Sequence, residues 1–134
     1  MAIYGIGTKI NNQQVNSQFY QNNIAGIGWS RAEAPDLHEI FKSIKTGDIV
    51  FLKSSSYSSD ITVKGVGVVM DNVILTHNQY GFIEIGRNIK WLSHRHFKIF
   101  RPANSKNNVR GNTIYQEFHP DVTIVIMGEV EKML

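Results

Sequence analysis

Trp29 is the residue of this 134-residue sequence best placed to bind a flat ligand. It follows the glycine-containing apolar run IAGIG and precedes the polar residues Ser30 and Arg31, so we expect it at the end of a strand. An indole there offers a face on which a nucleobase can stack, which contributes roughly 1–3 kcal/mol per base. The alternative for Trp29 is a place in the core, which we expect for Trp91 because its neighbours are apolar.

A lysine followed by serines is the second feature that suits such a ligand. Lys53, Ser54 and Ser55 come directly after an apolar run, and Tyr57 lies in the serine-rich loop that follows. A lysine ammonium can contact a phosphate, and serine hydroxyls can donate or accept hydrogen bonds at the edge of a base. Tyr57 would add a second ring to a site of this kind.

The sequence lacks the residues and motifs that several other kinds of site require. The chain has no cysteine, which excludes a disulfide, a thiolate metal site and a cysteine nucleophile. His94 and His96 are spaced like two ligands on one face of a strand, but no third ligand is near them, so we predict no metal site. The motifs of phosphate loops, nucleophile elbows and dinucleotide sites are absent. We therefore expect a binding protein without a cofactor rather than an enzyme.

The composition is that of one globular domain spanning residues 1–134. A formal net charge of +3 and a pI of about 9.2 permit a phosphate-bearing ligand without demanding one. No apolar run approaches the ~20 residues of a membrane helix, and the first residues do not resemble a secretory signal. We expect a cytoplasmic protein that does not bind a membrane.

A helix and two strands in the middle of the chain would position these residues. Apolar residues recur at helical spacing over residues 37–44, and Asp36 with Glu39 forms an expected capping pair. The unbroken apolar run at residues 49–52 predicts a strand buried on both faces, and residues 61–69 predict a second strand.

The rest of the chain predicts short strands and two more helices. We expect a short helix over residues 12–22, a turn at 86–88 and a C-terminal helix after Pro120, whereas residues 113–118 fit a strand or a helical turn equally. The remaining predicted strands are residues 2–7, 24–29, 73–76, 82–85, 89–92 and 97–100. Six or seven short strands with two or three helices indicate an α+β fold with a curled, antiparallel-rich sheet.

The order of several segments resembles the PUA-like superfamily. IAGIGW, GDIVFLKS and VKGVGVV are similar to its EVE and YTH group, and the similarity extends to AIYGIGTKIN and RGNTIYQEFHP. The resemblance implies a PUA-like β-barrel of six to seven strands with flanking helices. Similar EVE-like modules occur beside nucleases and ATPases of modification-dependent restriction, which implies a defence role and an effector nuclease or ATPase as partner.

The resemblance also implies where a ligand would bind. In the EVE and YTH group the pocket lies where the first strands and the strand after the helix end. The matching residues are Gly7, Thr8, Trp29, Ser30, Lys53, Ser54 and Ser55. Arg110 and Asn112 would close over this pocket, unless Asn112 only caps an element. The three cage tryptophans of YTH relatives have no counterpart here, so the resemblance does not extend to an aromatic cage for a methylated base.

These observations predict a non-enzymatic module that recognises a modified base in DNA or RNA, or a free nucleotide. One alternative is a small amidohydrolase or nuclease similar to the ASCH type, with Lys53, Thr113 and a glutamate such as Glu117 as its reacting groups. Another is a stand-alone protein that sequesters a nucleotide, or that binds proteins through its sheet edges. The sequence predicts neither the modification nor the oligomeric state.

Overall fold

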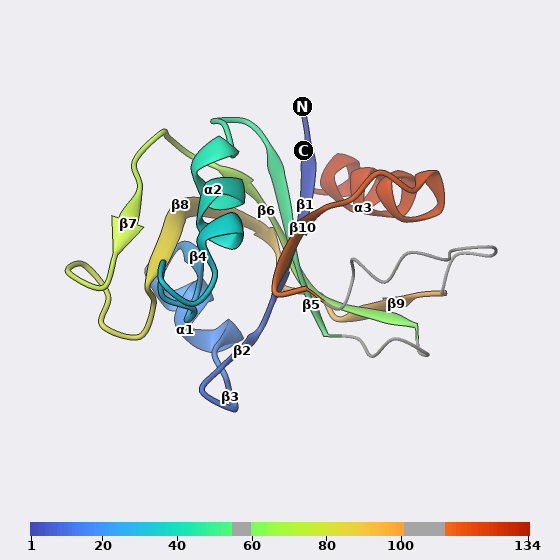
Figure 1. Ribbon diagram of the computed structural model, residues 1–134. Helices are drawn as coiled ribbons and strands as arrows, with labels where there is room; N and C mark the ends of the chain where they lie inside the picture. Colours follow the sequence, from blue (N-terminus) through green and yellow to red (C-terminus); the bar gives the residue numbers. More distant parts are fainter. Residues whose placement is uncertain (55–59, 101–111) are drawn as a thin grey trace.

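The computed structural model describes residues 1–54, 60–100 and 112–134 (Figure 1). The helices are α1 (Asn16–Asn22), α2 (Pro35–Ser43) and α3 (Pro120–Lys132). The strands are β1 (Ile3–Gly7), β2 (Lys9–Ile10), β3 (Gln13–Gln14), β4 (Ile24–Ile27), β5 (Ile49–Ser54), β6 (Ile61–Val69), β7 (Leu75–Thr76), β8 (Ile85–Ser93), β9 (Phe97–Ile99) and β10 (Ile114–Gln116). Within the described ranges, none of the helices has the length and apolar character needed to cross a membrane.

A curled half-barrel sheet forms the centre of this mixed α+β fold. Six strands follow the order β10-β1-β5-β6-β8-β4, while β9 pairs with β6 and β7 pairs with β8. β1 and β5 run parallel, and the other pairs of this sheet are antiparallel. Figure 1 shows α1 and α2 on one side of the sheet and α3 on the other. The predicted α+β class, a curled sheet with flanking helices, is confirmed.

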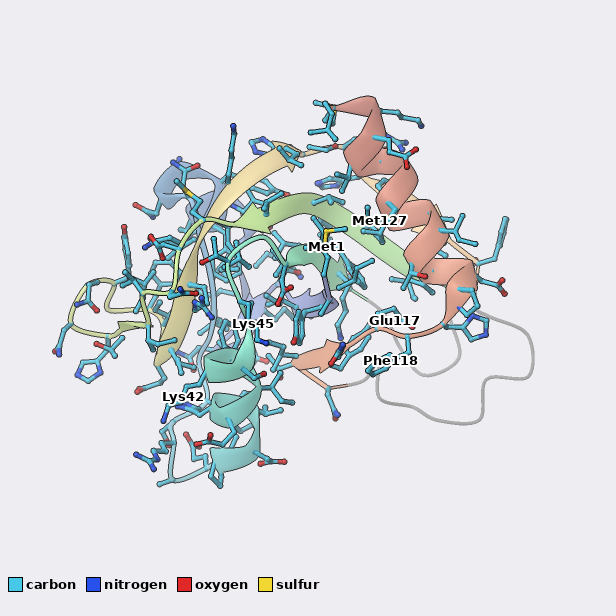
Figure 2. The ribbon with its side chains drawn as sticks, turned by 90° about the horizontal axis from the view of Figure 1, so that it is seen from above. Met1, Lys42, Lys45, Glu117, Phe118 and Met127 are labelled. Carbon is cyan, nitrogen blue, oxygen red and sulfur yellow. The ribbon has the colours of Figure 1, made fainter. Side chains whose placement is uncertain are left out.

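β5 is buried on both faces, as its apolar run predicts. Val50 and Leu52 belong to the core cluster that includes residues of α1 and α2, whereas Ile49 and Phe51 belong to the cluster under α3. All four residues are at most 2% exposed. In Figure 2, Met127 lies on the side of α3 that faces the sheet, where it packs against the second cluster. Because each such side chain contributes roughly 1.5–3 kcal/mol on burial, β5 joins the two halves of the core.

The start of α2 differs from the prediction. Ala34 is the N-cap residue and makes no side-chain hydrogen bond, so the predicted capping pair of Asp36 and Glu39 is wrong. Pro35 takes the first helical position, where the missing amide donor costs nothing. Asp36 lies in the first turn, where the helix dipole favours an acid, and Glu39 pairs with Lys42 at 3.7 Å.

The predicted N-terminal helix is shorter than expected and starts at Asn16. Asn11 and Asn12 have positive φ angles of 52° and 64° and form the turn between β2 and β3. Two-residue hairpin turns of this kind need positive φ at both central residues, which asparagine tolerates well. The hairpin pairs Lys9 with Gln14, so these residues are extended rather than helical.

The predicted turn at residues 86–88 is wrong, because these residues belong to β8. Arg87 is only 1% exposed, and its guanidinium donates to three backbone carbonyls. One NH1 bond goes to the carbonyl of Phe41 at 3.1 Å and another to that of Ile44, while NH2 reaches the carbonyl of Asp71 at 2.7 Å. The guanidinium therefore fastens the C-terminal end of α2 to the sheet.

The C-terminal region contains both a strand and a helix. Of the two alternatives for residues 113–118, the strand is correct, because β10 pairs with β1. The predicted helix after Pro120 is confirmed as α3. In the predicted hairpin between residues 73 and 85, β7 is limited to Leu75–Thr76 and its partner strand β8 begins only at Ile85.

Replacing Arg87 with methionine should destabilise the fold by roughly 3–6 kcal/mol. The variant keeps an apolar stem but removes the donor to three backbone carbonyls, and each group left unsatisfied costs about 1–3 kcal/mol. Urea unfolding followed by circular dichroism measures the loss. Lys90→Met, at an exposed position of the same strand, is the matched control and should change the free energy of unfolding by less than about 0.5 kcal/mol. Equal stability of the two variants would contradict the role given to Arg87.

Candidate functional site

A polar pocket lies where β1, β5 and β10 meet at one end of the sheet. Gly7 pairs with Lys53 in the parallel register, and the Gly7 amide donates to the carbonyl of Thr113 at 2.7 Å. The pocket has a volume of about 290 Å³. Its lining residues are Gly7, Thr8, Lys9, Gln14, Lys53, Ser54, Asn112 and Thr113.

Lys53 is the buried charge of the polar pocket. The residue is only 5% exposed, and its Nζ donates to the carbonyl of Asn112 at 2.8 Å and lies 5.4 Å from the ring centroid of Tyr115. Burial lowers the pKa of Lys53 to about 8, because the charged form loses hydration. Near neutral pH the ammonium is therefore charged but poorly hydrated, which strengthens its attraction for an anion that enters the pocket.

Gln14 is held in a fixed orientation beside Lys53. The Thr8 hydroxyl donates to Gln14 Oε1 at 2.7 Å, and Lys64 Nζ donates to the same oxygen at 3.1 Å. Lys64 is the extra residue of a β-bulge opposite Leu52 and Lys53, and bulges re-aim side chains. Because the oxygen is occupied by these donors, the amide nitrogen of Gln14 is presented as a donor to a ligand.

Trp29 stands beside the polar pocket and is 48% exposed. Its Nε1 donates to Thr113 Oγ1 at 3.0 Å, and its carbonyl accepts a hydrogen bond from His38 Nε2 at 2.6 Å. Gly28 allows close approach of the β2–β3 hairpin, because a Cβ there would come within 2.6 Å of a methyl group of Ile10. The hydrogen bond to Thr113 therefore fixes the indole and the hydrogen bond from His38 fixes the backbone, while much of the ring remains open to solvent.

Two further hollows of about 360 Å³ each border Trp29, and we call them the indole pockets. The first is lined by Lys9, Ile10, Asn11, Asn12, Gly28, Trp29, Glu33 and Thr113. The second is lined by Trp29, Glu33, Ala34, Asp36, Leu37, Asn112 and Thr113. Thr113 lines all three pockets, so the hydrogen bond between Trp29 and Thr113 marks their common border. The arrangement can hold a flat ring against Trp29 and an anionic group beside Lys53.

The structure brings together six of the ten predicted ligand-binding residues. Those that line the polar or indole pockets are Gly7, Thr8, Trp29, Lys53, Ser54 and Asn112. Ser30 lines none of these three pockets; its hydroxyl accepts a hydrogen bond from the Glu33 amide at 3.2 Å. Ser55, Tyr57 and Arg110 lie outside the described residues.

Lys9, Gln14 and Glu33 also line these pockets, although the sequence motifs considered above did not single them out. The signal for Lys9 and Gln14 is the intervening Asn-Asn pair, which suits a two-residue hairpin turn and places the flanking residues opposite each other. The signal for Glu33 is its spacing from Ser30, since the two residues exchange hydrogen bonds as in a capping box.

Glu117 does not join Lys53 and Thr113 in one pocket. Its amide donates to the carbonyl of Ile3, whereas Lys53 lies opposite Gly7, four residues further along β1. At about 3.3 Å per residue, this separation is roughly 13 Å. Figure 2 shows Glu117 in the connection between β10 and α3. Lys53 and Thr113 both line the polar pocket, whereas Glu117 lines none of the three pockets.

His94 and His96, which are spaced like two metal ligands on a strand, lie among aromatic and basic side chains. In the described part of the chain, no group of three or more His, Cys, Asp or Glu side chains could hold a metal ion. His94 instead stacks on Tyr20, with 4.0 Å between ring centroids and 15° between ring planes.

The chain belongs to the family described as a domain of unknown function, DUF8426, whose model matches residues 30–117. None of the curated proteins matches the sequence. A solved structure with a similar fold is the NMR structure of Rpa0253 from Rhodopseudomonas palustris, a structural genomics target. It has a TM-score of 0.59 and 10% sequence identity, and the match covers 100% of this chain and 96% of that one. At this identity the likeness shows the fold alone.

The lowered pKa of Lys53 predicts that stability rises with pH in a defined window. Between pH 8, near the folded-state pKa, and 10.5, the ordinary value, the unfolded state binds a proton that the folded state does not. Relative to Lys53→Met, the wild-type free energy of unfolding should therefore increase across this window, by at most about 3 kcal/mol.

Urea unfolding at pH 7.5, 9 and 10 measures this difference. Lys9→Met, at an exposed position in the same pocket, is the control for removing a lysine. If the wild type and Lys53→Met keep a constant difference at all three pH values, Lys53 does not have the lowered pKa.

Proposed function

We propose that this chain is a non-enzymatic binding module for a base-containing ligand, either a modified base in nucleic acid or a nucleotide. In this proposal the ring of the ligand stacks on Trp29, and its anionic group lies in the polar pocket beside Lys53. The observation that carries the proposal is the fixed, half-exposed indole next to a buried ammonium.

The way in which Trp29 is held favours binding over a purely structural role. A tryptophan that serves the core is mostly buried, whereas 48% of Trp29 is exposed. Hydrogen bonds to Thr113 and from His38 fix its indole and its backbone. A ligand that stacks on this ring would therefore not have to order it first, which reduces the entropic cost of binding.

The charge around the pockets supports an anionic group on one side of the ligand. Among the described residues, the lining of the polar pocket includes Lys9 and Lys53 and no acidic residue. The indole pockets contain the acids Glu33 and Asp36, on the other side of the border formed by Thr113. Repulsion from these carboxylates and attraction to the lysines would orient a nucleotide with its phosphate toward Lys53.

Binding without turnover is the proposal that fits these contacts best. Lys53 has the lowered pKa that a general base needs, but Glu117 lines none of the three pockets, and its backbone lies roughly 13 Å from that of Lys53 along the sheet. The sequence resemblance to EVE-like modules gives separate support, and it extends the proposal to a cytoplasmic reader that acts with an effector nuclease or ATPase. Trp29 is the one tryptophan at the pockets, so the proposal does not include an aromatic cage.

Replacing Trp29 with alanine should abolish ligand binding with little loss of stability. The binding panel contains single-stranded DNA and RNA with plain, methylated or hydroxymethylated bases, and the corresponding nucleoside monophosphates. Binding of each ligand is measured by calorimetry or by tryptophan fluorescence. We expect the free energy of unfolding to fall by only about 1 kcal/mol, the value of the lost hydrogen bond to Thr113.

Trp29→Phe is the matched variant, because it keeps a stacking ring and loses the indole donor. It should retain most of the affinity. Full binding by Trp29→Ala would contradict the proposal, and so would a stability loss of several kcal/mol in that variant, since it would make Trp29 a core residue.

Affinity for a nucleoside monophosphate should fall as the pH rises through about 8, because Lys53 then loses its charge. A bound phosphate favours the charged form, so the fall begins somewhat above that pH and approaches tenfold per pH unit at most. The uncharged nucleoside with the same base is the control and should show no such fall. Identical pH profiles for the two ligands would place the phosphate elsewhere.

A further inference from the structure

We propose that the stacked rings of Tyr20 and His94 form a second binding subsite, which takes another nucleotide of a single nucleic-acid strand whose first base lies on Trp29. This inference rests on the proposed function and deepens it, because it selects a polymer over a free nucleotide. It is carried by an exposed, fixed ring stack that is joined to the polar pocket through a single residue, Lys64.

The ring stack is rigid on its inner side. The Tyr20 hydroxyl donates to the carbonyl of Lys64, and the Tyr20 ring meets the edge of Trp91 at 5.7 Å and 85°. Trp91 packs against the core, as its apolar neighbours predict, and its Nε1 donates to the carbonyl of Phe19 at 3.0 Å. Gly65 leaves room for this arrangement, since a Cβ there would lie 3.1 Å from the Tyr20 ring. Tyr20 is therefore a fixed base for whatever lies on it.

His94 has no comparable structural contacts. Its ring lies parallel to Tyr20, with 4.0 Å between centroids, yet the residue is exposed. No described residue hydrogen-bonds to its ring nitrogens. An exposed ring held flat in this way offers a stacking face and a polar edge, the two features by which single-stranded bases are bound.

Lys64 connects the ring stack to the polar pocket. Its carbonyl holds Tyr20, and its ammonium holds Gln14, which lines the polar pocket. The β-bulge at Lys64 makes this double contact feasible, because it turns the side chain out of the regular ladder. Lys64 therefore links the ring stack to the polar pocket directly, through its carbonyl on one side and its ammonium on the other.

The charges along this path suit a phosphate backbone. Lys64 lies between the two subsites, and Lys9 and Lys53 line the pocket at one end. Glu129, which contacts the residues on both sides of His94 in the sequence, is already paired: Arg95 NH2 and Nε contact its carboxylate at 2.6 Å and 3.1 Å, and the Ser93 hydroxyl donates to it at 2.8 Å. A strand running from Trp29 past Lys64 to His94 would therefore meet cations without facing an unpaired carboxylate of this cluster.

The test compares a six-nucleotide single strand with the nucleoside monophosphate of the same base. Both DNA and RNA strands are used, because the subsite recognises a ring and a phosphate that the two share, and a duplex of the same sequence is included. We expect the single strand to bind more tightly than the monophosphate and the duplex. His94→Ala should weaken strand binding by roughly 5- to 150-fold, the equivalent of one stacked base, and leave monophosphate binding unchanged.

Two variants keep the test decisive. His96→Ala removes an exposed histidine two residues away and should bind like the wild type. His94→Phe keeps a ring on Tyr20 and should restore strand binding, which separates stacking from any effect of His94 on folding.

The inference is overturned if the strand binds no better than the monophosphate, if the duplex binds best, or if His94→Ala affects both ligands equally or neither. These failures are distinct from failure of the proposed function. If Trp29→Ala abolishes monophosphate binding while His94→Ala changes nothing, the first site stands and the second falls. If Trp29→Ala leaves binding of every ligand intact, the proposed function itself is wrong.

Discussion

The buried guanidinium of Arg87 is the contact on which the position of the candidate site depends. It has no carboxylate partner among the described ion pairs; its NH1 and NH2 groups donate to backbone carbonyls at the end of α2 and at Asp71, whereas its buried Nε has no partner among the described residues. Burial lowers its pKa, while Asp71 and Asp48 act in the opposite direction. Because these bonds fix α2 against β8, they also fix His38 on α2, which holds the backbone of Trp29. A contact in the core thus sets the place of an exposed ring.

Two features at the pockets are unfavourable for stability. Lys53 is a buried charge whose hydration is lost on folding, and Trp29 exposes a large apolar ring. That both occur at one border, with Thr113 between them, is the strongest physical reason to regard the border as a site of function.

Local patterns predicted the elements whose signal lies in a few consecutive residues of the sequence. The run at β5 and the proline at the start of α3 belong to this class. Arg87 was misplaced in a turn because a Gly-Arg-Asn sequence resembles a surface turn, and only the tertiary structure provides the carbonyls that make a buried arginine acceptable. The pocket was predicted in part, through strand ends such as Gly7 and Lys53. The role of Gln14 could not be predicted, since it depends on a bulge that brings Lys64 to it from another strand.

The site is built from two separate parts of the chain, and the sheet explains why neither suffices. The family match covers residues 30–117, which include Lys53, Asn112 and Thr113, whereas the first 29 residues supply Gly7 and Trp29. β1 lies between β5 and β10 and pairs with both, so without it β10 would lose its partner strand and β5 would pair only with β6. The same strand ends at the polar pocket. The element that completes the sheet is therefore also the element that brings Lys53 and Thr113 to a common border.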